Sequence, residues 1–327
     1  MLRSVKALLR SRQLFKNWLD IGIKYWLIKH GIANARTLIV KCRDGGELAI
    51  EPRIYSGIVN AYYDGLIRNV NRRGLVVGDV LMPLAWWPLA YAVDCAKSLG
   101  FRFDGDRLVI DYLGREVRFP PAVAPFIGDI ICENFVGGAY DDLDVRGRVV
   151  VDVGAGVGDT ALLFALRGAE RVIALEPYPS LYRIAKEVVE LNNVGDKVVL
   201  LNAGVGGMDG SFKAGDCEIG YKLFRPERCR GDVDVRVYML DSLVREFDVE
   251  DAVLKMDCEG CEYEAIPRAS KDAIKAFRQV QIEYHSGYEE LKRLFVKLGY
   301  AVKIKPMKST RTPLEKQGYI VAGRREQ

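Results

Sequence analysis

The feature that most constrains the fold is a regular alternation of strand-like and helix-like segments that begins at Val149. Short apolar runs alternate there with longer stretches in which apolar residues recur every three or four positions. Apolar strands separated by helices are typical of a parallel, doubly wound sheet that helices cover on both faces. Ligands of such sheets bind beyond the carboxyl ends of the strands. The alternation predicts strands at 149–153, 171–176, 197–202, 252–257, 279–284, 301–305 and 317–322, and helices at 158–167, 180–192 and 288–298.

The first 36 residues differ in composition from the rest. Residues 1–36 carry eight basic side chains and one acid, Asp20, which gives +7; the whole chain is +4, so the remainder is −3. Apolar residues at helical spacing make this part a basic amphipathic helical segment. Such a segment could pack on a domain, contact a membrane surface or bind nucleic acid, and the sequence leaves these three interpretations open.

Residues 37–128 mix short strand-like runs with turns, and we expect an accessory α+β region there. A helix is predicted over 83–100, and a hairpin around Gly114. Residues 129–327 then form the main α/β domain, and the accessory region would help to form its substrate site. The strands predicted in the accessory region are 37–42, 47–50, 107–112 and 115–119.

Cysteine usage and hydropathy bear on the compartment. The seven cysteines are scattered and odd in number, which favours free thiols in a reducing cytosol over a disulfide framework. Cys258 and Cys261 form a lone CxxC pair, and without a second pair at similar spacing we expect no zinc site. The most apolar stretch, Leu75–Val93, is interrupted by an aspartate and two prolines, so we expect no integral membrane segment. These features predict a cytoplasmic protein, with peripheral membrane contact through residues 1–36 as an open alternative.

A glycine-rich turn follows the first strand of the alternation. In the run VVVDVGAGVGDT, Gly154, Gly156 and Gly158 separate the strand from the helix, where glycine allows a tight turn and a close approach of ligand. A dinucleotide would bring a doubly negative pyrophosphate to this turn. Two acids, Asp152 and Asp159, stand beside it and would repel that group. The turn therefore favours a cofactor without a pyrophosphate.

The same acids favour a cationic cofactor. S-adenosylmethionine (SAM) presents an ammonium and a sulfonium, and both positive groups would be attracted by Asp152 and Asp159. Glu176 ends the next strand, where a carboxylate can accept hydrogen bonds from both hydroxyls of a ribose. Asp159 alone could simply be a favourable acid in the first turn of a helix. That simpler interpretation does not account for Asp152 and Glu176, so the sequence predicts SAM.

A second group of polar residues follows the strands at 252–257 and 279–284. Asp257 and Glu259 lie where a strand changes to a helix, and Glu283 and His285 end the next strand. Parallel strands bring these positions to one edge of the sheet, beside the glycine turn. A histidine with a near-neutral pKa could take a proton from a hydroxyl nucleophile, although a plain structural role for His285 is an equal alternative. Asp257 is the other candidate base, and Glu259 and Glu283 would orient the substrate.

At this point the motifs resemble a known family. The segments VDVGAGVGDTAL, LEPYP, LDSL, LKMDCEGCEYEAI and IEYH together are similar to the FkbM-type methyltransferases, over roughly residues 130–305. The specific signature is the acidic run at 257–262, whereas the glycine turn alone indicates only the wider Rossmann-like methyltransferase class. Cys258 and Cys261 depart from the small or branched apolar residues that are usual inside this signature.

The resemblance implies a seven-stranded, mostly parallel Rossmann-like sheet whose last strand, 317–322, is antiparallel. It implies that Asn202 and Ala203 lie near the adenine of SAM, and that a lead-in segment with Glu133 and Tyr140 closes over the cofactor. The interpretation requires no metal, although Asp257, Glu259 and Glu283 could in principle cluster around one. The candidate cofactor-binding residues are Asp152, Gly154, Ala155, Gly156, Gly158, Asp159, Thr160, Glu176, Pro177, Asn202, Ala203, Glu133, Tyr140 and Asp257.

The function expected from these features is transfer of a methyl group from SAM to a hydroxyl of a sugar, glycan or other small metabolite, with His285, Asp257 and Glu259 as catalytic candidates. Two alternatives stay open. One is an RNA methyltransferase that uses the basic segment 1–36 to bind phosphates, although DCEG stands where many base-amino methyltransferases carry Asn-Pro-Pro-Tyr. The other is a non-catalytic protein that keeps the SAM fold for partner recognition.

Overall fold

The structure is a computed structural model, in which the chain divides into two compact units, 1–132 and 133–327. Much of the helix predicted over 83–100 lies outside the residues that the structure describes. Those residues are 2–65, 67–71, 74–77, 80–83, 95, 98–215, 231–307 and 313–324.

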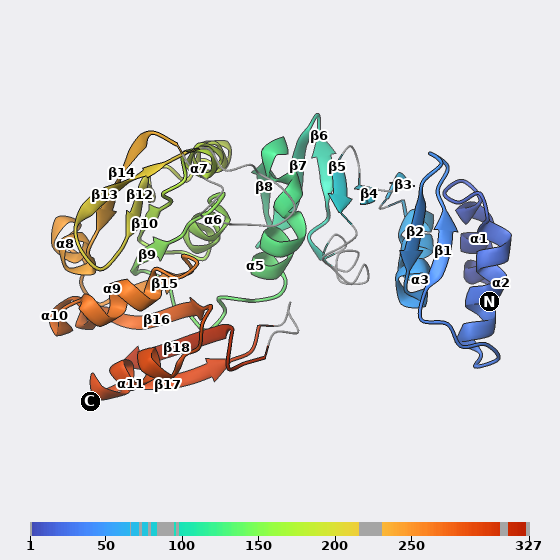
Figure 1. Ribbon diagram of the computed structural model, residues 1–327. Helices are drawn as coiled ribbons and strands as arrows, with labels where there is room; N and C mark the ends of the chain where they lie inside the picture. The colour runs from blue at the N-terminus through green and yellow to red at the C-terminus, as the bar shows by residue number, and fades with distance from the viewer. Residues whose placement is uncertain are drawn as a thin grey trace. The chain divides into compact units, whose positions relative to one another are not determined.

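The first unit combines helices with three small antiparallel sheets, β1–β2, β3–β4–β5 and β6–β7–β8 (Figure 1). The hairpin predicted around Gly114 is present, because β7 and β8 pair from Leu108 opposite Phe119 to Tyr112 opposite Arg115. Helical turns at Pro121–Phe126 and Ile127–Cys132 close the unit. Its elements are α1 (Leu2–Ser11), α2 (Trp18–Lys29), β1 (Leu38–Lys41), β2 (Glu47–Ile50), α3 (Pro52–Tyr63), β3 (Asn69–Asn71), β4 (Gly74–Val77), β5 (Val80–Pro83), β6 (Arg102–Asp104), β7 (Arg107–Tyr112) and β8 (Arg115–Phe119).

The second unit is built on one seven-stranded sheet with the order β11-β10-β9-β15-β16-β18-β17. All neighbouring pairs are parallel except those of β18, which runs antiparallel to both β16 and β17. The predicted doubly wound, mostly parallel α/β fold with a last antiparallel strand is therefore confirmed. The strands of this sheet are β9 (Val149–Val153), β10 (Arg171–Leu175), β11 (Val198–Leu201), β15 (Ala252–Met256), β16 (Phe277–Tyr284), β17 (Tyr300–Lys305) and β18 (Gly318–Arg324).

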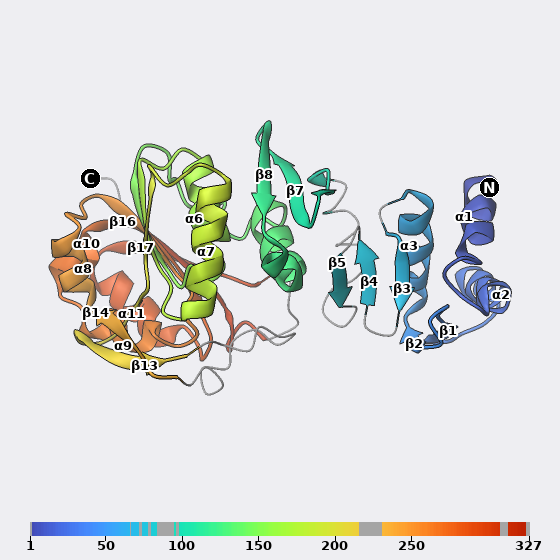
Figure 2. The ribbon, with the colours of Figure 1, turned by 90° about the horizontal axis from the view of Figure 1, so that it is seen from above.

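Helices cover both faces of this sheet. Figure 2 shows α6 and α7 on one face, and α8, α10 and α11 on the other. The central strand β15 is buried over its whole length, which explains why its sequence is continuously apolar apart from one lysine. The helices are α5 (Glu133–Phe135), α6 (Asp159–Leu166), α7 (Pro179–Leu191), α8 (Leu240–Glu246), α9 (Glu262–Arg268), α10 (Lys271–Lys275) and α11 (Glu289–Lys297).

A small sheet of three strands, which the sequence did not predict, lies between β11 and α8 along the chain. Its order is β12-β14-β13, with β12 parallel and β13 antiparallel to β14. The strands are short, and none of them has a regular alternation of buried and exposed positions that the sequence could reveal. They are β12 (Ala203–Val205), β13 (Gly210–Ala214) and β14 (Val233–Tyr238).

Two observations bear on the expectations for the cysteines and for membrane insertion. The structure joins Cys95 to Cys132 and Cys258 to Cys261 as disulfides, so the expectation of free thiols is wrong for these four residues. Cys42 is a buried free thiol. Within the described residues, every helix is too short or too polar to cross a membrane.

Candidate functional site

The glycine turn between β9 and α6 has three glycines with positive φ, of which two allow close backbone packing and one leaves open space. A Cβ on Gly154 would lie 1.8 Å from the carbonyl oxygen of Asp257, and one on Gly158 would lie 2.8 Å from the Cα of Ala185. These two glycines are therefore required by close backbone packing. A Cβ on Gly156 would meet nothing within 4 Å, so this position opens onto free space where a ligand can approach.

Asp152 lies in the interior at the end of β9, although we expected it to contact a cofactor directly. It is fully buried, and Thr160 Oγ1 donates a hydrogen bond of 2.6 Å to its Oδ2. Its Oδ1 lies 3.0 Å from Nζ of Lys255, a buried side chain on β15 that also donates to the carbonyl oxygen of Gly154 at 2.7 Å. Lys255 thus links the carboxylate of Asp152 to the backbone of the glycine turn. Sequence reasoning missed Lys255, whose only signal was a lone cation inside an apolar strand.

Glu176 follows β10 and is 2% exposed, with both carboxylate oxygens at the turn. Oε2 accepts a hydrogen bond from the backbone N–H of Gly156, and Oε1 accepts one from the N–H of Tyr178, both at 2.9 Å. Burial raises the pKa of Glu176 to about 8, against the opposing effect of these two donors. Asn202 supports the segment by donating to the carbonyl oxygens of Glu176 and Pro177 at 2.9 and 3.0 Å.

The other candidate residues lie on several elements of the second unit. Asp159 begins α6 and is buried; it accepts a 2.5 Å hydrogen bond from Asn134, and burial raises its pKa to about 6. Tyr140 is buried, with its ring centroid 5.7 Å from Nζ of Lys255. Glu133 accepts a hydrogen bond of 3.2 Å from the hydroxyl of Tyr319 on β18. Ala155 and Ala203 are buried, the first in the turn and the second in β12.

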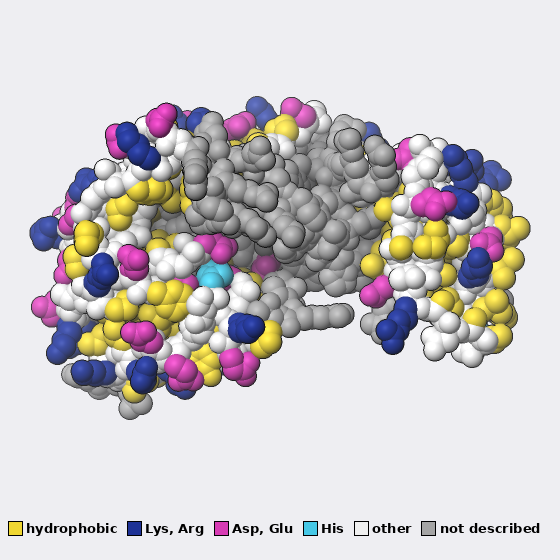
Figure 3. Space-filling model, in the orientation of Figure 1, with side chains coloured by type: hydrophobic (Ala, Val, Ile, Leu, Met, Phe, Trp, Pro, Cys, Tyr) yellow, Lys and Arg dark blue, Asp and Glu magenta, His cyan; other side chains and the backbone are white. Residues whose placement is uncertain are grey.

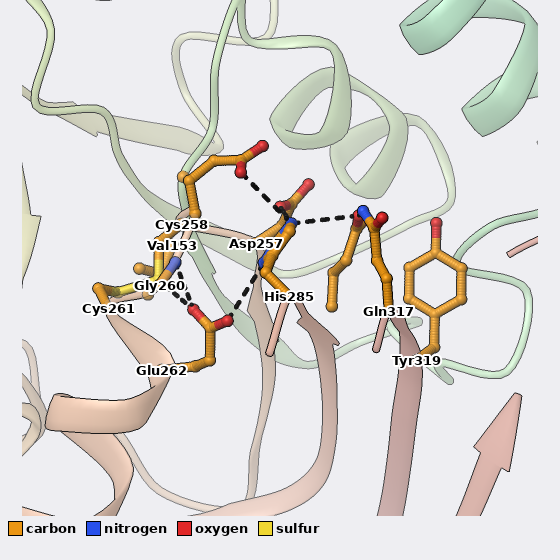
Figure 4. Close-up of polar contacts among 12 residues, drawn as sticks. Val153, Asp257, Cys258, Gly260, Cys261, Glu262, His285, Gln317 and Tyr319 are labelled. Carbon is orange, nitrogen blue, oxygen red and sulfur yellow. Dashed lines mark hydrogen bonds and ion pairs between the residues drawn. A yellow bond between two sulfur atoms is a disulfide. The ribbon is translucent and has the colours of Figure 1, made fainter. Parts of the chain in front are cut away.

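The second polar group forms one cluster around His285 at the carboxyl ends of β15 and β16 (Figure 4). His285 Nε2 lies 3.4 Å from an oxygen of Glu283, 3.5 Å from one of Glu259 and 3.9 Å from one of Asp257. On the other side of the ring, Nδ1 donates to Oε1 of Glu262 at 3.2 Å. We name these five residues the carboxylate–histidine cluster. One imidazole therefore faces four carboxylates.

Glu262 is the buried support of this cluster, and sequence reasoning left its role undecided. Its side chain is fully buried, and Oε2 also accepts the backbone N–H of Gly260 at 2.9 Å. Tyr263 supports the same loop: its hydroxyl accepts the N–H groups of His285 and Ser286 at 3.2 and 2.7 Å and donates to the carbonyl oxygen of Gly287. Its position one residue inside a helix gave no sequence signal for this role.

The protonation states in the cluster differ from those expected. Burial alone would lower the pKa of His285, but hydrogen bonds with Glu262 and Glu283 and the charge of Glu259 outweigh it and raise the pKa to about 11. Burial and the nearby charge of Glu283 raise the pKa of Asp257 well above its usual range. His285 therefore carries a proton at neutral pH instead of titrating near it, whereas Asp257 is a stronger base than an exposed aspartate.

The loop between β15 and α9 carries part of this cluster in a constrained shape. Glu259 has φ 55° and Gly260 has φ 116°, and the disulfide joins Cys258 to Cys261 across them. Gln317, before β18, donates to Glu283 at 3.1 Å and so fixes a further carboxylate.

Asp257, Glu283 and His285 each place one ligand-type atom within 4.8 Å of the others, so this part of the cluster could also hold a divalent cation.

The chain is similar over part of its length to several known methyltransferases. Over 85 residues the chain is 42% identical to the ribosomal protein L11 methyltransferase of Carboxydothermus hydrogenoformans, which is 26% of this chain and 28% of that protein. A crystal structure of a methyltransferase FkbM from Methylobacillus flagellatus matches with 16% identity and a TM-score of 0.40, covering 56% of this chain and 45% of that chain. The ribosomal protein L11 methylase of Lactobacillus delbrueckii matches with 14% identity and a TM-score of 0.37, covering 61% and 80%.

The family itself follows from a longer match. The model of the methyltransferase FkbM domain matches residues 152–320, a range that runs from the last residues of β9 into β18 and includes the glycine turn and the whole carboxylate–histidine cluster. This range is just over half of the 327 residues. The chain therefore belongs to the FkbM methyltransferase-domain family.

Proposed function

We propose that this protein transfers a methyl group from SAM to a hydroxyl oxygen of a sugar, glycan or other small metabolite. The observation that carries the proposal is the meeting of the glycine turn with the carboxylate–histidine cluster. The backbone of Asp257 approaches Gly154 so closely that a Cβ there would lie 1.8 Å from its carbonyl oxygen. A cofactor site and a set of proton-accepting groups therefore share one edge of the sheet, which is the usual ligand edge of this fold.

The residues of the turn fit the adenosine part of SAM. The space beside Gly156 allows close approach, and each oxygen of Glu176 has a second lone pair that can accept a ribose hydroxyl. Asn202 fixes this segment next to β11, where the adenine would lie. The cluster carries an excess of negative charge, which suits the positive sulfonium of SAM. When bound, SAM supplies a methyl group that its own sulfonium already activates.

In the mechanism that we propose, Asp257 accepts the proton of the acceptor hydroxyl. The acceptor oxygen would take the methyl group that bound SAM supplies as its own proton passes to Asp257. His285 is already protonated, so it acts by holding the surrounding carboxylates in place, while its Nδ1 donates a hydrogen bond to Glu262. Glu259 and Glu283 accept hydrogen bonds from neighbouring hydroxyls of the substrate. Positioning supplies much of the rate, and the base adds about 10²–10⁴-fold.

The charge of the cluster also bears on the class of acceptor. Asp257, Glu259, Glu262 and Glu283 surround a single imidazole, so phosphate groups would be repelled from the acceptor position. Neutral hydroxyl compounds meet several hydrogen-bond acceptors there and carry no negative charge to be repelled. This arrangement supports a sugar-like acceptor over RNA.

The test separates cofactor binding from chemistry. Calorimetry should show that the wild type and Asp257→Asn bind SAM with similar affinity, whereas Glu176→Gln binds it at least about tenfold more weakly because one ribose acceptor is lost. Turnover with a panel of sugars and glycosides should fall by about 10²–10⁴-fold in Asp257→Asn. A chelator should leave wild-type turnover unchanged, since Asp257 rather than a metal activates the hydroxyl.

Three results would contradict the proposal. Failure of the wild type to bind SAM would instead support a non-catalytic binding protein. Methyl transfer to RNA, with none to the hydroxyl panel, would support the nucleic-acid alternative. Loss of turnover on adding the chelator, with recovery on adding Mg²⁺ or Mn²⁺, would show that Asp257, Glu283 and His285 act as metal ligands.

A further inference from the structure

Helix α2 has large apolar side chains on its exposed side as well as on its buried side. Ile21 is buried against the rest of the first unit. Leu19, Ile23 and Trp26 follow the spacing i, i+4, i+7 and form one ridge, and each is about half exposed to solvent. Gly22 lies between them on the same face, where Leu8 of α1 approaches its backbone.

The exposed charged residues of α2 are Asp20, Lys24 and Lys29, so its surface combines large apolar side chains with charges. Exposed apolar patches that polar residues surround mark interaction sites. The ring of Trp26 lies 4.5 Å from that of His30, and all three side chains of the ridge stay about half exposed.

Helix α1 has a similar outer side. Val5 and Leu9 lie one turn apart and are each about half exposed, whereas Ala7 on the inner side is buried. Lys6 and Arg10 lie beside this ridge and are exposed. Both helices therefore turn large apolar side chains to the solvent while their inner sides complete the core of the unit.

The charge around these ridges is mostly positive. Residues 1–36 contain eight basic side chains and one acid, and that acid, Asp20, lies 2.9 Å from Lys24. Lys6, Lys16 and Lys29 are exposed. Figure 3 shows Lys and Arg side chains next to hydrophobic ones on the surface of this unit, at the right of the view. Apolar ridges beside cations are the pattern of helices that lie in the interface of an anionic bilayer.

We propose that the first unit docks on an anionic lipid bilayer, with α1 and α2 lying in the plane of the interface. The twelve residues of α2 are too few to cross a bilayer, so the helix lies along the surface. Trp26 would take the position at the headgroup level that tryptophan favours. The exposed lysines would meet the negative headgroups, and the ridges of α1 and α2 would enter the acyl boundary.

Two other occupants fit less well. RNA would pair with the cations but would leave Leu19 and Ile23 exposed to water. A second copy of the chain would bring two segments of net charge +7 together. An anionic bilayer would cover the apolar side chains of the ridges and pair with the cations at the same time. The proposal does not depend on the methyl-transfer reaction.

Flotation of the full-length protein with vesicles tests this proposal. Vesicles of phosphatidylglycerol mixed with phosphatidylcholine should carry the wild type, and phosphatidylcholine alone should carry much less. The triple variant Leu19→Gln, Ile23→Gln, Trp26→Gln should bind at least about tenfold more weakly, because three apolar side chains no longer enter the interface. Lys6→Gln and Lys16→Gln should each weaken binding by about fivefold at low salt.

Matched controls lie on the second unit. Val296 on α11 is about half exposed, as the ridge residues are, and Lys297 beside it is exposed. Val296→Gln and Lys297→Gln should leave flotation unchanged. Thermal unfolding of each variant should show an unchanged midpoint, so that a loss of docking is separated from a loss of folding.

Tryptophan fluorescence supplies a second readout. Brominated lipids should quench the wild-type emission, and Trp26→Phe should lose most of that quenching while it still floats. The proposal is overturned if the wild type does not float with anionic vesicles, or if the triple variant floats as well as the wild type. It is also overturned if a uridine oligonucleotide binds with the same dependence on Lys6 and Lys16 while vesicles do not bind. Concentration-dependent dimerisation that the triple variant abolishes, without vesicle binding, would assign the ridges to a second copy.

Discussion

At the scale of single residues, Glu176 connects the fold to cofactor binding. Burial raises its pKa to about 8, although two backbone N–H groups stabilise the charged form. Ribose hydroxyls are hydrogen-bond donors here, so they favour the carboxylate over the neutral acid. Binding of SAM should therefore release a proton from Glu176 at pH values below about 8.

This linkage gives a pH dependence of affinity. SAM should bind more tightly as the pH rises towards 8, because less of Glu176 has to lose a proton, and the affinity should level off above it. Calorimetry in buffers of different ionisation enthalpy would measure the released proton. In Glu176→Gln, the affinity should be weaker and nearly independent of pH over this range. An equal pH dependence in both proteins would contradict the role of Glu176.

His285 gives a second prediction at this scale, which concerns stability. Its pKa in the folded protein, about 11, lies above the usual 6.5, so its contribution to stability is fully present below 6.5 and is lost as the pH rises through about 11. The groups that face it are Asp257, Glu259, Glu262 and Glu283. His285→Gln should therefore lower the free energy of unfolding most near pH 6.5 and progressively less at higher pH. Urea unfolding at several pH values would measure this, and a constant difference would contradict the assigned charge.

At the scale of elements, two glycines of the turn between β9 and α6 have different roles: Gly154 allows close packing, and Gly156 leaves space for a ligand. Gly154→Ala places a methyl group against the backbone of Asp257, and should cost the ~1–2 kcal/mol of a left-handed residue plus the displacement of β15 from β9. Gly156→Ala has only the conformational cost, since its surroundings are open. Gly154→Ala should therefore lose clearly more stability, whereas Gly156→Ala should stay folded and bind SAM poorly. Thermal unfolding and calorimetry on both variants measure these two effects. The reverse pattern would contradict the assignment of the open space beside Gly156 to the cofactor.

The loop between β15 and α9 gives a prediction about redox conditions. Its disulfide, Cys258 to Cys261, spans Glu259 and Gly260, both of which have positive φ. Reduction removes this constraint and should let Asp257 and Glu259 move away from His285. Because a displacement of about 1 Å can cost 10²-fold in rate, we expect reductant to lower turnover by up to about 10²-fold while the affinity for SAM changes little. Cys258→Ser with Cys261→Ser should behave like the reduced protein and become insensitive to reductant. Equal turnover of the wild type with and without reductant would contradict this role.

Much of the fold could be predicted from the sequence because buried strands appear in it as runs of apolar residues. The strands β9, β10 and β15 are apolar runs, and Gly154, Gly156 and Gly158 mark the turn that follows the first of them. The edge at which the polar groups meet follows from the parallel order of these strands. The small sheet β12-β14-β13 was missed, because its short strands carry little periodic signal.

The partners of the site residues could not be predicted in the same way. Lys255 sits in an apolar strand and Glu262 in the first turn of a helix, and only three-dimensional contacts show that they hold Asp152 and His285. The pKa of His285 depends on carboxylates from α9, from β16 and from the loop before α9, so the residue type alone suggested a neutral imidazole. The cysteine pairs likewise depend on proximity, which neither their number nor their spacing defines.

At the scale of the whole molecule, the two units carry different kinds of surface. Residues 133–327 hold the glycine turn and the carboxylate–histidine cluster, whereas the segment 1–36 holds the excess of positive charge. On this account, the second unit performs methyl transfer and the first unit determines where the protein binds in the cell. The two functions can be tested apart, because the substitutions that remove one lie in a different unit from those that remove the other.

The measurement that tests the central claim most directly follows a labelled methyl group from SAM into an acceptor. Wild-type protein, incubated with methyl-labelled SAM and a panel of sugars and glycosides, should place the label on an oxygen as an ether that survives alkaline hydrolysis. Asp257→Asn should transfer it about 10²–10⁴-fold more slowly while still binding SAM. Label on nitrogen, on a carboxylate as an alkali-labile ester or on RNA, or equal transfer by Asp257→Asn, would contradict the account.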